Sequence, residues 1–122
     1  MHLDKVGTPG DISLETSVDG NTWSDYSWTD STGDTLTLSN VGDKVYFRAK
    51  TENQTIGISS SNYYKFVMTG KISSSGNIQA LLKVDCSRTD APANCYNGMF
   101  SGCTSLTQAP ELPATTLAKF CY

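Results

Sequence analysis

Short apolar runs with alternating polar residues fill the first half of the chain. In the run from Ile12 to Val18 every second residue is apolar or Thr, so one face of a strand would meet a core. Three later runs have the same character: Leu36 and Leu38, then Val45, Phe47 and Ala49, then Tyr64, Phe66 and Met68. Turn-forming residues such as Asp19-Gly20-Asn21 separate the runs. The pattern predicts a small antiparallel β-sandwich over residues 1–70, with a mobile contact loop at about Thr51 to Asn62.

The second half of the chain carries a repeat. The dipeptide Cys95-Tyr96 returns as Cys121-Tyr122, and this interval is typical of units that stack on one another. The residues between them include a regular apolar set: Met99, Phe100, Cys103, Leu106, Leu112 and Leu117. We expect a strand near Leu106 to Leu112 and helices over 92–101 and 115–122. Ile78, Leu81 and Leu82 have helical spacing and would cover the open side of the first unit.

Two motifs in this half resemble a known family. Cys-Tyr-x-x-Met-Phe-x-Gly-Cys-Thr-Ser-Leu begins at Cys95, and Ala-Pro-Glu-Leu-Pro-Ala-Thr-Thr-Leu-Ala begins at Ala109. From Cys95 to Tyr122 the chain is similar to the BspA-like, or treponemal-type, leucine-rich repeat of bacterial surface proteins. The resemblance implies a curved parallel sheet with helices outside, used for adhesion or recognition, without catalytic residues or a cofactor. It also implies a mainly β chain with an α/β repeat, in which residues 71–122 hold an N-terminal cap and the first repeat of a solenoid.

A second motif lies in the first half. Ser17 to Trp23 resembles the Asp-box, a hairpin motif of sialidase propellers and other β-proteins. In such a hairpin the Asp19 carboxylate accepts backbone N–H groups, Gly20 supplies a positive φ and Trp23 packs beneath the turn. We interpret this single copy as a structural staple.

The aromatic residues after this motif suggest a carbohydrate contact. Trp23, Tyr26 and Trp28 lie close together in the sequence, and flat aromatic faces stack on sugar rings. Alternation places one of Tyr26 and Trp28 in the core, so the other is the candidate exposed ring.

Charge and hydropathy exclude two classes of partner. The net charge is -3 with few charged residues, whereas nucleic-acid binding requires clustered Lys and Arg. The longest apolar runs are far below the roughly 20 residues that span a bilayer. Met1 to Gly10 has no apolar stretch of the kind found in signal peptides. An adhesin must be exported, whereas a virion protein reaches the outside by lysis, so both an extracellular cell-surface location and a virion surface stay open.

All four cysteines lie in the second half: Cys86, Cys95, Cys103 and Cys121. None forms a CxxC pair, so a zinc site is not indicated. Cys95 and Cys121 occupy equivalent repeat positions and should stack as small buried hydrophobes. Cys86 lies outside the repeat, and its pairing with Cys95 or Cys103 stays open.

Catalytic chemistry finds little support. The only histidine is His2, near an end expected to fray, so a Ser-His-Asp arrangement lacks its base. The acidic pairs Asp30/Asp34 and Asp85/Asp90 are expected to bond to turn backbone rather than act as an acid and a base. Asp30, Thr32 and Asp34 lack the remaining ligands of a calcium loop, so no metal site is expected. Asn53-Gln54-Thr55 matches a glycosylation sequon, which we interpret as coincidence.

The sequence therefore predicts a non-enzymatic surface recognition or adhesion protein. Its partner would be a protein or glycan on a cell surface, contacted by the strand face around Gln108 and Glu111 and by the N-terminal loop tips. Assembly as a homo-oligomer or on a larger particle is compatible with this function. The alternatives are a phage virion decoration, head-fibre or tail-fibre protein, and a carbohydrate-binding module that uses Tyr26 or Trp28.

Overall fold

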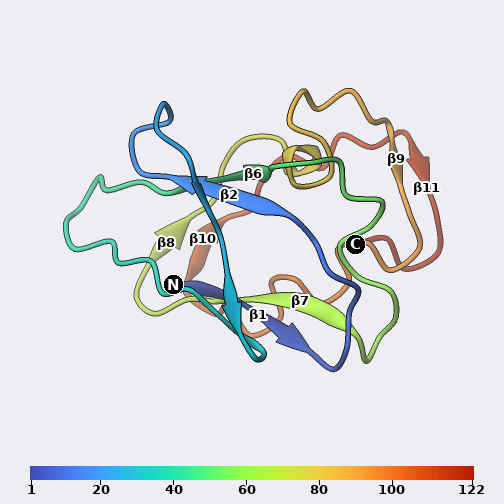
Figure 1. Ribbon diagram of the computed structural model, residues 1–122, viewed down its shortest axis with the longest axis horizontal. Coiled ribbons are helices and arrows are strands. Elements are labelled where there is room, and N and C mark those ends of the chain that lie inside the picture. The colour runs from blue at the N-terminus through green and yellow to red at the C-terminus, as the bar shows by residue number, and fades with distance from the viewer.

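The computed structural model describes all 122 residues, and the protein is mainly β with several small sheets (Figure 1). Its strands and one short 3-10 helix, η1, are, in chain order, β1 (His2–Val6), β2 (Leu14–Ser17), β3 (Ser24–Asp25), β4 (Trp28–Thr29), β5 (Thr32–Gly33), β6 (Tyr46–Ala49), β7 (Tyr63–Val67), β8 (Ile72–Ser73), η1 (Ile78–Leu81), β9 (Asp90–Ala91), β10 (Leu106–Gln108) and β11 (Thr116–Leu117).

The N-terminal region, residues 1–70, is built from antiparallel pairs, as its alternation predicts. β1 pairs with β7, β2 lies between β3 and β6, and β4 and β5 form a hairpin. Leu14, Tyr64 and Phe66 point into the core at the expected alternate positions. Two details of the strand prediction are wrong. Leu36 and Leu38 lie outside any strand, and Val18 is exposed because β2 ends at Ser17, where the tight turn begins.

The C-terminal region, residues 71–122, is built from parallel pairs. The chain makes a first pass (residues 71–103) and a second pass (residues 104–122) that runs beside it. β10 pairs with β8, Glu111 bridges Asn77, and β11 pairs with β9 (Figure 1). Leu106 and its partner Ile72 lie further apart in the sequence than Thr116 and its partner Asp90 do. The first pass therefore holds additional residues between its two strands, in the stretch that contains η1.

The two predicted helices of this region are wrong. Residues 92–103 form successive turns, with backbone N–H groups bonded three residues back, as from Met99 to Tyr96 at 3.1 Å. Asn94, Gly98 and Gly102 have φ of 57°, 69° and 80°, so a left-handed residue interrupts the chain at every fourth position. Residues 115–122 hold β11 and a turn instead of a helix. The expected helical segment at Ile78, Leu81 and Leu82 does form, as η1 and the turn after it.

A single hydrophobic core contains residues of both regions, among them Leu3, Tyr64, Leu82 and Met99. Backbone bonds also cross between the regions: Asn53 donates to Leu82, Gly57 to Cys95 and Phe66 to Met99, each over 2.8 Å. The N-terminal region therefore covers one side of the first pass, and the second pass covers the other.

The apolar repeat residues divide into buried and exposed sets. Cys95, Met99 and Cys121 are buried, while Phe100 and Cys103 pack against the core. Leu106 is half-buried. Leu112 and Leu117, which we expected inside a continuous seam, are 49% and 59% exposed. They belong to the second pass, whose outer side has no neighbour.

Candidate functional site

The turn that follows β2 has the geometry expected of an Asp-box. The Asp19 Oδ1 atom accepts the backbone N–H groups of Asn21 and Thr22 at 2.8 and 2.7 Å and the Ser17 hydroxyl at 2.9 Å. The N–H of Thr22 contributes most to holding the pKa of Asp19 far below its ordinary value. Gly20 has φ of 76°. Trp23 is half-buried beneath the Arg48 guanidinium, 3.7 Å from its ring centroid. The motif acts as a staple and offers no open site.

The aromatic residues form a core cluster rather than a sugar platform. Tyr26 is only 5% exposed, and its hydroxyl accepts the Leu3 N–H at 2.8 Å and donates to the Asp34 carbonyl at 2.9 Å. Burial raises its pKa to about 12. Trp28 is half-buried, contacts Tyr26 and Tyr64 edge-on, and donates its ring N–H to the Leu3 carbonyl at 2.6 Å. An exposed role for Tyr26 is therefore wrong, and only the outer part of Trp28 remains accessible.

The two polar residues predicted to bind a partner lie on the parallel ladder. Gln108 ends β10, and its carbonyl accepts the Ser74 N–H at 3.0 Å. Glu111 donates its N–H to the Gly76 carbonyl at 2.8 Å and accepts from the Ile78 N–H at 3.1 Å. Both side chains are exposed. The backbone of this stretch is hydrogen-bonded to the first pass on both sides of the Asn77–Glu111 bridge, so its side chains stand at fixed positions. Thr107 is also exposed, and its hydroxyl donates to the Ile72 carbonyl. We call Thr107, Gln108 and Glu111 the strand row.

The repeated dipeptide produces a repeated contact. The Tyr96 N–H donates to the Cys121 carbonyl at 2.9 Å, and the rings of Tyr96 and Tyr122 stack with centroids 5.6 Å apart and planes 10° apart. The Tyr96 hydroxyl donates to Gln79 Oε1 at 2.6 Å, and Gln79 Nε2 donates to the Asp90 carbonyl at 2.9 Å. Gln79 is fully buried and all its polar groups are paired, so this network fixes how the first pass closes.

A clamp that the sequence reasoning missed joins the two regions. Arg88 binds Asp90 through two nitrogens, at 2.9 and 2.5 Å, and donates to the carbonyls of Asn53 and Gln54 at 2.9 and 3.1 Å. The amide side chain of Asn53 accepts the Ser13 N–H and donates to the carbonyls of Ser13 and Leu81. The available signals were an Arg two residues from an Asp and an Asn in a loop, which are too common to be diagnostic.

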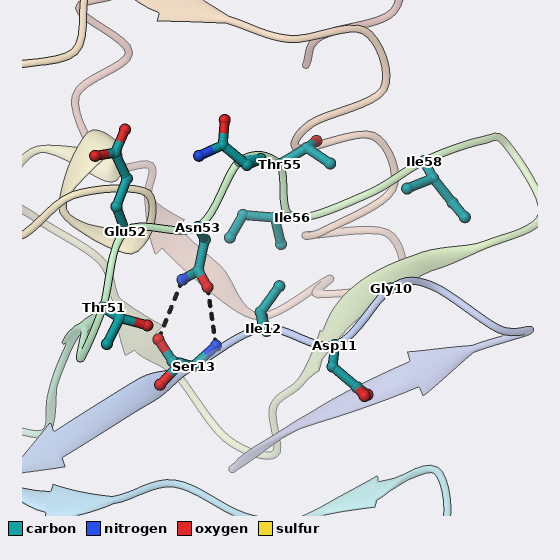
Figure 2. Close-up of a pocket in the computed structure, with 11 residues that line it drawn as sticks. Gly10, Asp11, Ile12, Ser13, Thr51, Glu52, Asn53, Thr55, Ile56 and Ile58 are labelled. Carbon is teal, nitrogen blue, oxygen red and sulfur yellow. Dashed lines mark hydrogen bonds between the residues drawn. The ribbon is translucent and has the colours of Figure 1, made fainter.

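A shallow hollow of about 410 Å³ lies beside this clamp, between the segment 10–13 and the loop 51–58. Figure 2 shows the residues that line it. Asn53 closes one end through its paired bonds to Ser13, and Ile12, Ile56 and Ile58 give it apolar walls. The loop that was expected to be mobile is anchored at Asn53, which is buried, and so the sequon there is inaccessible in the folded protein. The hollow is open and its lining combines polar groups with the three isoleucines, so it suits contact with a surface better than enclosure of a small molecule.

The four cysteines and the only histidine, His2, are the side chains that nucleophilic catalysis would use. Burial raises the pKa of the Cys86, Cys95 and Cys103 thiols, which disfavours the reactive thiolate. All four cysteines are free. His2 is held in β1, contrary to the expected fraying, with Nε2 3.3 Å from Asp4, and no hydroxyl or thiol bonds to it.

Three of the four acidic residues of the two predicted pairs are bonded: Asp34 and Asp85 to backbone as expected, and Asp90 to a side chain instead. Asp34 accepts the Ser27 N–H at 3.1 Å, Asp85 accepts the Ser87 N–H at 2.9 Å and Asp90 binds Arg88. No three His, Cys, Asp or Glu side chains gather closely enough to hold a metal ion.

The chain matches no protein-family model, and neither the curated proteins nor the solved structures show a significant similarity to it. No helix has the length and apolar character that crossing a membrane requires.

Proposed function

We propose that the protein is a non-enzymatic recognition or adhesion protein at a bacterial cell surface, in which residues 71–122 form the start of a leucine-rich repeat solenoid. The observation that carries the proposal is the parallel pairing of β9 with β11 at the same spacing as the repeated dipeptide, reproduced by the Tyr96 and Tyr122 stack. A repeat whose equivalent residues pair in register is the basic contact of a solenoid.

The strand row of the second pass is the proposed contact surface for a protein or glycan partner. Thr107, Gln108 and Glu111 are exposed on backbone that is already hydrogen-bonded to the first pass. Polar groups on a preformed strand lose little conformational freedom when a partner binds, and many copies on a surface multiply the affinity. A virion fibre protein would use the same surface, and isolation of the protein from particles rather than cell envelopes would favour that alternative.

The experiment is binding of the labelled protein to a glycan array and to cultured epithelial cells. The double variant Gln108→Ala, Glu111→Ala should lose most of the signal on whichever surface is bound. The matched control Thr37→Ala, Lys44→Ala removes two exposed polar side chains from the segment before β6 in the N-terminal region and should bind like the wild type. Binding that survives the first variant, or no binding to either surface, would contradict the proposal.

The carbohydrate-binding alternative has a separate test. Trp28 is the only one of its two candidate rings with accessible area. Glycan binding that is lost in Trp28→Phe but kept in Gln108→Ala, Glu111→Ala would favour that alternative over contact through the strand row.

A further inference from the structure

The sheet formed by β3, β2 and β6 has an outer face that turns away from the core. In its register Glu15 lies opposite both Asp25 and Arg48, and Ser17 lies opposite Tyr46. Paired residues share a face of a sheet, and the residues that alternate with them in β2 and β6 are buried or pack against the core. The side chains of Glu15, Tyr46 and Arg48 therefore stand together on the outer face of β2 and β6, which run side by side in Figure 1.

Arg48 is held in a fixed orientation on this face. Its guanidinium carbon lies 3.7 Å from the ring centroid of Trp23, and its Nε donates to Oε2 of Glu15 at 2.9 Å. A cation–π contact and a charge-assisted hydrogen bond together restrict the side chain. Trp23 itself follows the Asp-box turn, whose backbone is bonded to Asp19. The guanidinium therefore needs little further ordering to bind a ligand.

The bonds within the protein leave part of this pair free. The Nη1 and Nη2 atoms of Arg48 have no hydrogen-bond partner, and neither has Oε1 of Glu15. No side-chain atom of these half-buried residues is both buried and unpaired, so the three free atoms reach solvent. The other arginine of the chain, Arg88, uses Nε, Nη1 and Nη2 in bonds to other residues. Arg88 is thus fully engaged by the fold, whereas Arg48 presents free donors beside a free acceptor.

Tyr46 adds an aromatic surface next to these polar atoms. It is 40% exposed and precedes Arg48 by two residues in β6, so both side chains stand on the same face. The ring is supported by the Asp-box turn, because a Cβ atom at Gly20 would lie 3.7 Å from it. We call Glu15, Tyr46 and Arg48 the outer-face site.

The charges around the outer-face site favour a neutral ligand. Arg48 is paired with Glu15, and Lys50 is paired with Asp25 at 2.6 Å. Asp19, in the turn that supports the tyrosine ring, adds a third carboxylate to these two cations. An anion would therefore meet one carboxylate in excess. A hydroxyl group both donates and accepts, so neighbouring hydroxyl groups can bond to the free guanidinium nitrogens and to the free carboxylate oxygen at once.

We propose that the outer-face site binds a neutral sugar unit of a glycan. The ring of the sugar would pack on Tyr46, while two adjacent hydroxyl groups bond to Arg48 and Glu15. The face is open and the contact is small, so we expect a dissociation constant of about 1 mM or higher for one sugar unit. Such a contact would not by itself hold the labelled protein on an array, and it does not depend on the strand row.

The test is a nuclear magnetic resonance titration of the isotope-labelled protein with methyl glycosides of glucose, galactose, mannose and N-acetylglucosamine. We expect at least one glycoside to shift the Arg48 Nε–H and Trp23 ring N–H signals, while the Trp28 ring N–H signal stays in place. Inorganic phosphate at the same ionic strength should shift neither Arg48 nor Trp23. No shift with any glycoside, a shift of Trp28 alone, or a response of Arg48 to phosphate alone would each overturn the proposal.

Two variants of the outer-face site sharpen this test. Arg48→Lys keeps the positive charge but loses the planar donor pairs, so it should raise the dissociation constant about tenfold or more. Tyr46→Ser changes an exposed side chain and should weaken binding without unfolding the sheet, which the unchanged signals of the core confirm. Wild-type affinity in both variants would overturn the proposal.

The double variant Gln108→Ala, Glu111→Ala is the matched control, because it removes the strand row and leaves residues 1–70 unchanged. It should bind the glycosides like the wild type. Loss of glycoside binding in this control would place the sugar on the strand row, which would overturn the outer-face site and support the proposed function. Failure of the outer-face site is thereby distinguished from failure of the strand row.

Discussion

The two regions of the molecule hold their strands together by different means. In residues 1–70 the strands are antiparallel and side chains hold the backbone in place. The Asp19 carboxylate binds backbone of its own turn, while the Tyr26 hydroxyl and the Trp28 ring N–H bind backbone of β1. In residues 71–122 the strands are parallel, and the backbone register between two passes does most of this work. The first arrangement depends on individual side chains, whereas the second depends on strand register and leaves β11 without a partner strand on its outer side.

The two regions share one hydrophobic core, so we expect them to unfold together despite their different strand arrangements. Leu3 and Leu82 are both fully buried, one in each region, and both belong to the same cluster. We expect Leu3→Ala and Leu82→Ala each to lower the free energy of unfolding by about 2–5 kcal/mol. Each should shift a single urea transition that is the same by far-UV circular dichroism and by tryptophan fluorescence, which reports only on Trp23 and Trp28.

Separate transitions would contradict this expectation. If Leu82→Ala lowered the dichroism midpoint and left the fluorescence midpoint unchanged, the regions would be independent modules with a boundary near residue 70.

The Arg88 clamp tests how strongly the regions are joined. Arg88→Gln removes charge-assisted bonds to Asp90 and to the carbonyls of Asn53 and Gln54. The side chain is only 14% exposed, so we expect a loss of about 1–3 kcal/mol in urea unfolding. Lys50→Gln breaks the exposed pair between Lys50 and Asp25 within the N-terminal region and should change stability little. Equal effects of the two variants would remove the argument for a clamp.

The Asp19 turn gives a pH dependence that belongs to the N-terminal region. Because the pKa of Asp19 is lowered in the folded protein, its carboxylate stabilises the fold fully above the ordinary carboxylate pKa of about 4, and this contribution disappears as the pH falls below it. Asp19→Asn should be less stable than the wild type at neutral pH and should lose less stability between neutral and strongly acidic pH. Urea midpoints over a pH series measure both; parallel profiles would contradict the expectation.

The smallest effect concerns one residue of the C-terminal region. Phe120 has φ of 55°, and Asn94, at the equivalent position of the first pass, has φ of 57°. A bulky side chain is strained in this conformation and Asn tolerates it, so Phe120→Asn should raise the free energy of unfolding by up to about 1 kcal/mol. The measurement is thermal unfolding at a low protein concentration, where self-association does not contribute. A clear loss of stability would mean that contacts of the Phe120 ring stabilise the fold by more than the backbone strain destabilises it.

The sequence predicted those parts of the fold that depend on local period and turn chemistry. Alternation located β2, β6 and β7, and the Asp-box residues indicated the hydrogen bonds of their own turn. The interval of the repeated dipeptide equals the register of β11 on β9, although a helix was expected at residues 115–122. The helix over 92–101 was wrong because apolar residues at positions 95, 96, 99 and 100 suit a string of tight turns equally well. Only the left-handed Asn94, Gly98 and Gly102 distinguish the two, and two of these are ordinary turn glycines.

The candidate contacts were predicted less completely. Exposure of Gln108 and Glu111 follows from the strand row, but the burial of Tyr26 depends on a bond from Leu3, far away in the sequence, that no local pattern reveals. Arg88 and Asn53 are likewise joined only by the tertiary fold.

The additional residues of the first pass have a practical consequence for engineering. They leave the ladder after η1 and rejoin it at β9, with Val84 and Asp85 exposed at the turn between. The second pass spans the same two strands without them, so the ladder does not depend on the length of this excursion. A foreign peptide grafted between Val84 and Asp85 should therefore be displayed without disturbing either strand pair, at only a modest entropic penalty for the longer loop.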